Sequence, residues 1–318
     1  MRNIDPFSAR LFLAVIEEGS IAKAAARECI VASAVSKRVS ELEALFRVPL
    51  LERGVKGVTP TPAGEAFQHH ARMLLQAMDR MYGEMSEYVE GVRGRVKVLA
   101  TVSSLSSRLP SDIQDFVTAH KRIKIDLEEA STPAIFRAVV DGVCDVGIAP
   151  EISSLEGLQA FPYRVLTLAV VMPAGHPLST QKQLSYADTL EFDQVELYRG
   201  SGMATLLDNA AQNLNLPKRT YIRVLSYETI CRMVASGMGV GVVPLFFAHS
   251  HGETFKLKFL PLTDAWAHPM ISIAVRDANA LGPASRAFVE HMKQCGVQAR
   301  LQNSMYDAMS MHRGGQGR

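Results

Sequence analysis

The sequence predicts an α+β multidomain chain, in which a small helical domain, a long linker helix and a two-lobed α/β domain follow one another. Three observations predict this order. Two short amphipathic stretches stand close together within residues 20–43, an unbroken apolar heptad stripe runs through residues 67–88, and strand-like runs alternate with helical runs from residue 94 on. These patterns indicate a compact helical pair, a paired long helix and a layered α/β domain, respectively.

The composition fits a globular protein of several domains. The chain has 318 residues, of which 47% are hydrophobic, so it can form two or three cores. Lys and Arg number 34 against 32 for Asp and Glu, so the total charge does not indicate a polyanionic partner. Cations do outnumber anions between Lys23 and Lys56, which makes that segment mildly basic.

Cysteine spacing and the N-terminal sequence indicate the compartment. The four cysteines are widely scattered, without the spacing of a disulfide framework, a zinc site or a CxxC pair. The start MRNIDPFSAR has no apolar signal core, and no apolar run approaches the ~18 residues that span a bilayer. We therefore expect a cytoplasmic protein without a membrane segment.

The first domain is predicted from the stretch SIAKAAARECIVASAVSKRVSELE. Ser20 is a suitable N-cap for an alanine-rich helix, and a second helix buries one side. The opposite side of that second helix carries short hydroxyls and a cation that suit a DNA groove. The layout is that of a helix-turn-helix, although a simple α-hairpin would show the same periodicity. The buried side comprises Val35, Val39, Leu42 and Phe46, and the open side Ser33, Ser36, Lys37 and Ser40.

Flanking segments complete this domain. Apolar residues from Phe7 to Ile16 recur at helical spacing and would close a three-helix core. The run RVPLLERGVKGVTPT, with its glycines and Pro60, suits a small β-wing that carries Arg53 and Lys56. Residues 1–60 are therefore predicted to form a winged helix-turn-helix.

Residues 61–91 are predicted to form the linker helix. Thr61 can cap it and Pro62 suits its first position. The spacing of its apolar residues specifies a seam with a partner helix, and no second helix of this chain matches it. We therefore expect a homodimer joined through this helix. The seam comprises Phe67, Ala71, Leu74, Met78, Met81, Met85 and Tyr88.

The remaining chain is predicted to form two α/β lobes with largely parallel sheets. Strand-like runs such as RVKVLAT, KIDLEE, DVGIA, VELY, YIRVL and VGVVP alternate with helical runs at 106–119, 133–141, 202–214, 228–236 and 283–295. We expect lobe I at 92–163 and 267–300 and lobe II at 164–266. The sequence from Gly296 to Arg318 is expected to be irregular, and its last part, 301–318, is counted as a tail outside the lobes.

Hydroxyl residues follow several of these strands. Open parallel sheets bind ligands where their strands end and helices begin, so these side chains could converge on a small anion, with a weak preference for a carboxylate. Ordinary helix capping explains any single one of them more simply, but their repetition at equivalent places favours a site. The residues are Ser103, Ser104, Thr132 and Ser201.

No pattern indicates catalysis. The glycines of GMGVGVVP run from a helix into a strand, the reverse of a dinucleotide fingerprint, and HExxH, GxSxG and P-loop patterns are missing. Arg199, beside the loop YRGSGM, could pair with a ligand carboxylate, although we expect it to be exposed on that loop. We therefore expect no enzyme activity, no cofactor and no metal.

Five pieces of the sequence resemble those of a known family. FLAVIEEGSIAKAA, AVSKRVSELE and TPAGE are similar to the N-terminal signature of the LysR-type transcriptional regulators, and VVMPAGHPLS and VASGMGVGVVP resemble parts of their effector domain. The resemblance covers about residues 5 to 295. It implies an effector domain like that of periplasmic solute-binding proteins, tetramers built from two dimers, and double-stranded DNA and a small effector as partners.

The resemblance also implies roles for individual residues. Ser36 and Lys37 occupy positions that reach DNA, Arg53 lies near phosphate, and Ser103 or Ser104, Thr132 and Ser201 line the cleft between the lobes. The family commonly has Ser-Gln-Pro where this chain has Val31, Ala32 and Ser33, which leaves Ser33 as the candidate cap and puts the operator preference in doubt. The candidate DNA-contacting residues are Ser33, Ser36, Lys37, Arg38 and Arg53.

The leading hypothesis is a sequence-specific transcription regulator controlled by a small effector, with a small carboxylate as the favoured class. The alternative is a solute-binding or enzymatic α/β domain with an incidental helical N-terminus. Removal of residues 1–90 separates them, because only a regulator would then lose operator binding while it kept its ligand.

Overall fold

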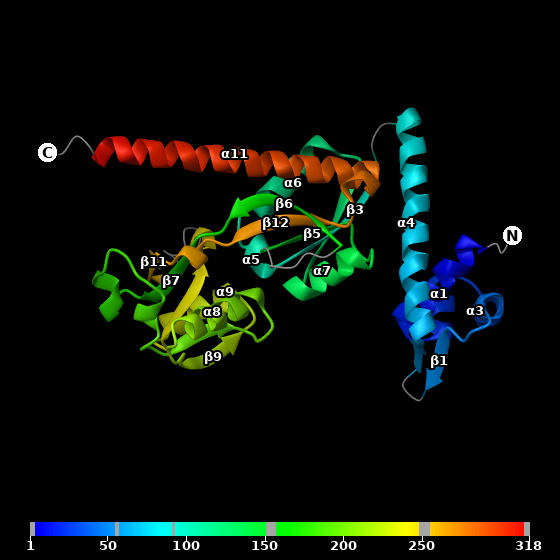
Figure 1. Cartoon of the computed structure of the whole chain (residues 1–318), viewed down its shortest axis with the longest axis horizontal. Helices are drawn as coiled ribbons and strands as arrows, with labels where there is room; N and C mark the ends of the chain where they lie inside the picture. The colour runs from blue at the N-terminus through cyan, green and yellow to red at the C-terminus, as the bar shows by residue number, and fades with distance from the viewer. Residues whose placement is uncertain (1–3, 55–56, 91–92, 151–156, 248–254, 315–318) are drawn as a thin grey trace. The chain divides into compact units, whose positions relative to one another are not determined.

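The computed structural model describes residues 4–54, 57–90, 93–150, 157–247 and 255–314 (Figure 1). The chain divides into two compact units, one formed mainly by residues up to Arg93 and the other mainly by residues from Gly94 on. Among the described residues, no helix combines the length and the apolar character needed to cross a membrane.

The first unit is a winged helix-turn-helix followed by a long helix. Ser20 Oγ accepts a hydrogen bond from the backbone N–H of Lys23, and Thr61 Oγ1 accepts one from Gly64 N–H at 3.0 Å, so both predicted caps are confirmed. The elements are α1 (Pro6–Glu18), α2 (Ile21–Arg27), α3 (Ala32–Phe46), the antiparallel wing β1 (Leu51–Gly54) and β2 (Gly57–Pro60), and α4 (Pro62–Glu90).

The cap predicted for α3 is wrong. Its N-cap is Val31, no side chain caps it, and Ser33 already lies inside the helix. A residue within the first turn has helical dihedrals and cannot serve as the half-in cap residue. The first N–H groups of α3 therefore have no capping side chain, and Val31 is 66% exposed.

Two apolar clusters on α1 form the core of this unit. One holds Phe12, Leu42 and Leu50 together with Phe67 and Ala71 of α4. The other joins residues of α1 and α2 to Val35 and Val39 of α3. The prediction that Phe67 and Ala71 belong to a seam with a partner helix is therefore wrong, because both pack on the helical domain of their own chain. Beyond them Leu74, Met81 and Met85 are exposed.

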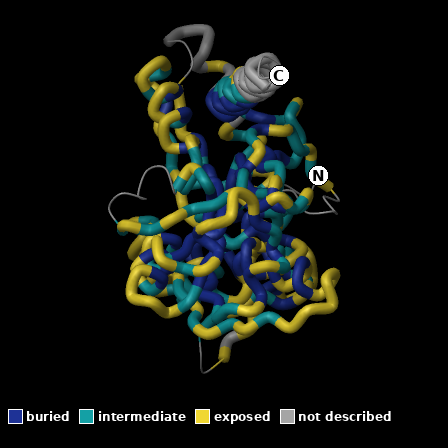
Figure 2. Tube along the Cα trace, turned by 90° about the vertical axis from the view of Figure 1, so that its left-hand side faces the viewer, coloured by how far each residue is buried: buried dark blue, intermediate teal, exposed yellow. Residues whose placement is uncertain are grey.

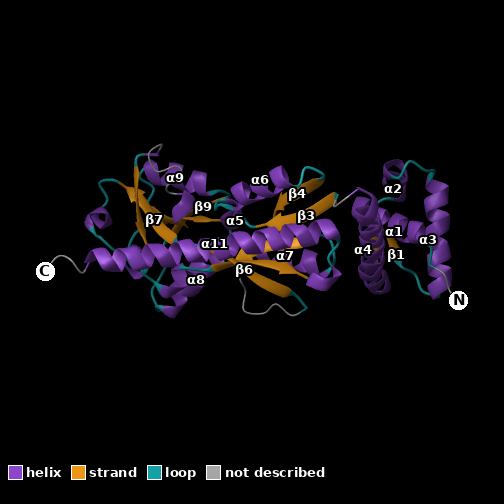
Figure 3. Cartoon of the chain, turned by 90° about the horizontal axis from the view of Figure 1, so that it is seen from above, coloured by secondary structure: helices purple, strands orange, loops and turns teal. Residues whose placement is uncertain are grey.

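The second unit contains two five-stranded sheets, one in each lobe (Figure 3). In lobe I the order is β4-β3-β5-β12-β6, and in lobe II it is β11-β7-β10-β8-β9. The central strands are buried; every residue of β8 and β10 is buried, including Gln194 and Glu196 of β8. The buried residues concentrate inside the unit (dark blue in Figure 2). The strands are β3 (Gly94–Ala100), β4 (Ile123–Glu129), β5 (Val146–Pro150), β6 (Gln159–Val165), β7 (Leu168–Pro173), β8 (Gln194–Leu197), β9 (Thr220–Val224), β10 (Val240–Pro244), β11 (Leu257–Pro261) and β12 (Met270–Val275).

All six strands named from the sequence are present as β3, β4, β5, β8, β9 and β10, but the expectation of largely parallel sheets is wrong. Parallel pairing joins β4-β3-β5 and β10-β8-β9, whereas β12, β6, β7 and β11 are antiparallel. The chain passes between the sheets from β6 to β7 and again from β11 to β12. Such direct passages need no crossover helix, so the alternation of strands and helices does not reveal these strands.

The helices of this unit lie on the faces and ends of the sheets. They are α5 (Val102–Leu105), α6 (Leu109–Ala119), α7 (Thr132–Val140), α8 (Gly202–Asn213), α9 (Tyr227–Ala235), α11 (Pro283–Gly314) and the short 3-10 helices η1 (Pro177–Thr180), η2 (Ala187–Thr189), η3 (Ala265–Ala267) and η4 (Ala278–Ala280).

The irregular tail expected from Gly296 is wrong, because α11 continues to Gly314. A Cβ on Gly296 would lie 2.6 Å from the carbonyl oxygen of Tyr163, so this glycine allows close packing of α11 on β6 rather than ending the helix. Residues 315–318 lie outside the described part.

Candidate functional site

The open side of α3 is a polar surface. Ser33 is exposed, Ser36 is half-buried, and the Lys37 side chain is 78% exposed. Lys37 Nζ lies 3.9 Å from Glu41 Oε1 one turn later. An exposed pair of this kind contributes at most about 1 kcal/mol, so Lys37 can exchange Glu41 for another anion at little cost.

Arg38, unlike the other candidate residues of α3, has a side chain that contacts the start of α1. Its guanidinium pairs with the Asp5 carboxylate, donates to Ser8 Oγ at 3.1 Å and lies 5.3 Å from the Phe7 ring centroid. Burial alone would raise the pKa of Asp5, but hydrogen bonds from Phe7 N–H and Ser8 and the Arg38 charge hold that pKa below its usual value. Arg38 therefore ties α3 to the start of α1.

The wing carries the remaining candidate. The backbone of Arg53 lies in β1 opposite Val58 of β2. Its side chain and the whole of Lys56 fall outside the described residues.

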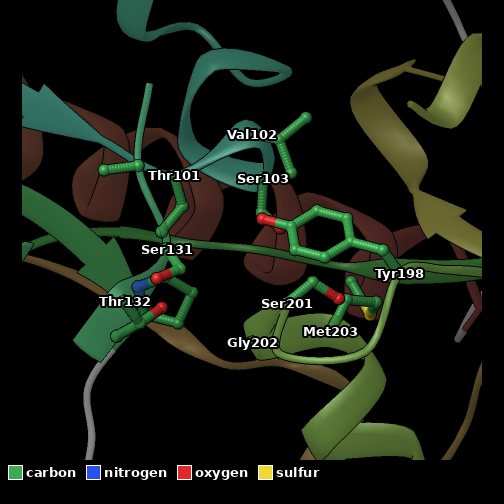
Figure 4. Close-up of a pocket in the computed structure, with 11 residues that line it drawn as sticks. Thr101, Val102, Ser103, Ser131, Thr132, Tyr198, Ser201, Gly202 and Met203 are labelled. Carbon is green, nitrogen blue, oxygen red and sulfur yellow. The ribbon is translucent and has the colours of Figure 1, made fainter. Parts of the chain in front are cut away.

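A pocket lies between the lobes of the second unit, with about 300 Å³ of space between the atoms including its open mouth (Figure 4). The walls come from the segments that follow β3, β4 and β8 and from Pro150, the last residue of β5, at the carboxyl ends where the sequence predicts a site. Among the residues that the structure describes, no charged side chain lines it. The lining residues are Thr101, Val102, Ser103, Ala130, Ser131, Thr132, Pro150, Tyr198, Ser201, Gly202 and Met203.

Thr132 and Ser201 bring two helix starts to this pocket. Thr132 is the first residue of α7, and its buried Oγ1 has no hydrogen-bond partner among the described residues. Ser201 caps α8, where its Oγ accepts from Ala204 N–H at 3.1 Å. A Cβ on Gly202 would lie only 3.0 Å from Thr132 Oγ1. The absence of a side chain at Gly202 thus allows the two lobes to approach closely here.

The two adjacent serines of α5 have different environments. Ser103 lines the pocket, and its Oγ lies 2.8 Å from the Tyr227 hydroxyl oxygen. Ser104 does not line the pocket. It is fully buried, and its Oγ lies 2.9 Å from Thr101 Oγ1 and donates to the Ile148 carbonyl at 3.2 Å. Ser104 therefore fastens the end of β3 to β5.

Several lining residues were not among the candidates, including Thr101, Ser131, Tyr198 and Met203. They stand in the segments TVSSLSSRLP, STP and YRGSGM, which follow β3, β4 and β8, so their position at strand ends could have indicated them. The Tyr198 ring reaches across the pocket toward Ser103 (Figure 4). Arg199 is exposed, as predicted. Within the described stretches, no three His, Cys, Asp or Glu side chains cluster as metal ligands would.

Comparison with known proteins identifies both units. The family model described as the bacterial regulatory helix-turn-helix protein, lysR family, matches residues 8–65, and that of the LysR substrate binding domain matches residues 90–295. The HTH-type transcriptional regulator BenM of Acinetobacter baylyi is 30% identical over 272 residues, which cover 84% of this chain and 88% of BenM.

Solved structures show the same fold. Full-length CbnR, a LysR family transcriptional regulator solved in complex with its target DNA, superposes with a TM-score of 0.65 at 20% identity and covers 92% of this chain and 100% of its own. The effector binding domain of QuiR in complex with shikimate gives a TM-score of 0.58 at 19% identity, with 65% and 98% covered. The chain belongs to the LysR-type family of DNA-binding transcriptional regulators, with an N-terminal helix-turn-helix domain and a C-terminal effector-binding domain.

Proposed function

We propose that this regulator binds a small carboxylate in the pocket between its lobes, and that this binding changes its affinity for an operator. The unpartnered hydroxyl of Thr132 supports the proposal most directly. A buried hydroxyl without a partner costs about 1–3 kcal/mol, which a hydrogen bond to a ligand oxygen would remove.

The surroundings of Thr132 favour an anion. Helix N-termini attract negative charge, and the starts of α7 and α8 both meet the pocket. The hydroxyls of Ser103 and Ser201 add further donors. Because no cation is among the described lining residues, a single carboxylate suits the pocket better than a polyphosphate. QuiR, a structural relative, was solved with shikimate, itself a carboxylate.

In the first unit, the proposed DNA-contacting surface is the open side of α3. Ser33, Ser36 and Lys37 would face the major groove, and Arg53 would lie near phosphate. Arg38 would act mainly by holding α3 on α1 through Asp5.

The exposed part of the heptad stripe supports dimerisation. Leu74, Met81 and Met85 are exposed in the single chain, and a second α4 would cover them. We further propose that dimers assemble into tetramers, that the protein works in the cytoplasm, and that it has no enzyme activity. An effector then changes the affinity for DNA only to the extent that it binds one quaternary arrangement more tightly than another. A difference in binding free energy of ~1–3 kcal/mol suffices.

The test is a thermal-shift screen of small carboxylates on the full chain and on Thr132→Val, which keeps the shape of the side chain but removes its hydroxyl. A carboxylate that binds the folded wild type should raise its Tm and shift operator binding, and Thr132→Val should lose most of that increase. Thr118→Val, on the exposed face of α6, is the matched control. The proposal fails if Thr132→Val binds the carboxylate as tightly as wild type.

A further inference from the structure

A buried hydrogen bond crosses from one lobe to the other beside the pocket. Ser103 Oγ on α5 and Tyr227 Oη on α9 lie 2.8 Å apart, although 124 positions separate them in sequence. Ser103 is 5% exposed and Tyr227 1% exposed. Tyr227 does not line the pocket, so it contacts the lining from behind.

The direction of this bond follows from the two hydroxyls. A phenol is more acidic than an alcohol and is the better donor. Burial raises the pKa of Tyr227, so the phenol keeps its proton. Within the described residues, each of these oxygens has only the other as a hydrogen-bond partner. The geometry allows either oxygen to donate, and the greater acidity of the phenol favours Tyr227 O–H as the donor to Ser103 Oγ. In that arrangement the Ser103 proton is left for another acceptor.

The pocket is where that acceptor would lie. Ser103 is a lining residue, and its neighbour Ser104 donates instead to the Ile148 carbonyl. A hydroxyl that already accepts one hydrogen bond becomes a better donor, because the bonds in a chain polarise one another. Ser103 is thus set up as a donor toward the pocket.

We propose that Tyr227 is a specificity-determining residue: it orients the Ser103 hydroxyl as a donor into the pocket, so that the site selects a carboxylate over the matching carboxamide. A carboxylate only accepts hydrogen bonds. The NH₂ group of an amide is itself a donor, so it would face the Ser103 O–H donor without an acceptor between them. Because Tyr227 belongs to lobe II and Ser103 to lobe I, this arrangement is complete only when the lobes are closed. The inference rests on the proposed function.

The first experiment needs no ligand. Tyr227→Phe in the full chain keeps the ring, which packs 6.0 Å from the Phe247 ring, and removes only the donor. Amide hydrogen exchange in residues 102–105 and 227–235 should then become about tenfold faster, as expected when a hydrogen bond of ~1.4 kcal/mol is lost. Tyr221→Phe on exposed β9 is the control. Unchanged exchange in Tyr227→Phe would show that the bond does not hold the lobes together.

The second experiment compares paired probes by titration calorimetry: benzoate with benzamide, and acetate with acetamide. Wild type should prefer the carboxylate of a pair. Tyr227→Phe should lower carboxylate affinity about tenfold and amide affinity less than about twofold. A residue that only packs the helix would lower both equally, and that result would overturn the specificity role.

A double-mutant cycle checks the route of the effect. In a Ser103→Ala background, Tyr227→Phe should have no further effect on carboxylate affinity, since the hydroxyl that it orients is gone. Additive losses would overturn the proposal. If no carboxylate bound wild type at all, both the proposed effector class and the selectivity of Ser103 would fall, whereas the exchange result would still decide whether the bond joins the lobes.

Discussion

The Phe67 ring lies edge-on against the Phe12 ring, with centroids 4.9 Å apart and an interplanar angle of 74°. Phe12 belongs to α1 and Phe67 to α4, so this contact joins the linker helix to the core of the helix-turn-helix domain. Such pairs add about 0.5–1.5 kcal/mol beyond the area that they bury. The orientation of the first turns of α4 is therefore set by the domain that precedes it.

Phe67→Ala should lower the free energy of unfolding of the N-terminal unit by about 3–5 kcal/mol, because it leaves a cavity beside Phe12 and Leu42. Urea unfolding followed by circular dichroism measures the change. Tyr82→Ala, at a position of α4 that is 62% exposed, should change stability by less than about 0.5 kcal/mol. Equal losses in the two variants would contradict the core contact.

Lys37→Ala should weaken operator binding about tenfold without unfolding the protein. The slope of log K for DNA binding against log salt concentration should decrease in magnitude by about one. The reason is that the Lys37 side chain is exposed and that, among the described residues, its ion pair is the weak one with Glu41. Fluorescence anisotropy at several salt concentrations measures both quantities. Lys124→Ala, an exposed cation of β4, should bind like wild type; unchanged binding by Lys37→Ala would remove α3 from the proposed interface.

Met81→Glu should dissociate the dimer. Met81 is 49% exposed in the single chain, and a carboxylate at a buried seam position loses hydration without a partner. Sedimentation velocity should show the dissociation constant raised at least about tenfold, on the order of 1.4 kcal/mol. Asp79→Lys changes charge more, but at an exposed position off the seam. An equal effect of Asp79→Lys would indicate general electrostatics rather than a helix pair.

Gly202→Ala should reduce carboxylate affinity several-fold while leaving the Tm of the free protein near its wild-type value. The added Cβ would lie 3.0 Å from Thr132 Oγ1 and so oppose closure of the lobes. Alanine is otherwise favoured over glycine by about 0.5–1 kcal/mol inside a helix. Gly175→Ala, where a Cβ meets nothing within 4 Å, is the control. Undiminished affinity in Gly202→Ala would show that the lobes need not approach at this point.

Asp5→Asn should cost stability at neutral pH and progressively less in acid. The folded state lowers the pKa of Asp5, so the stabilisation is present above the unfolded pKa of about 3.9 and disappears as pH falls through the lower folded value. Urea midpoints measured from pH 7 to 3 should therefore converge for wild type and variant. A difference independent of pH would show that the charge of Asp5 is not what stabilises the contact with Arg38.

Local patterns determined much of this protein. The periodicity of Val35, Val39 and Leu42, the caps Ser20 and Thr61, and the six strands with their helices follow from neighbours within one or two turns, so they can be read from the sequence. Ser103, Thr132 and Ser201 line one pocket, as predicted from their positions after the carboxyl ends of strands. That prediction also needs only the order of the elements along the chain.

Only the tertiary structure decided the contacts between distant residues. The sequence does not show that Arg38 is held by Asp5, that Ser104 faces Ile148, that Gly296 continues a helix against β6, or that Tyr227 reaches Ser103 from the other lobe. Each partner lies tens of positions or more away. Their pairing is selected by packing and by the need to satisfy buried polar groups, which no local pattern encodes.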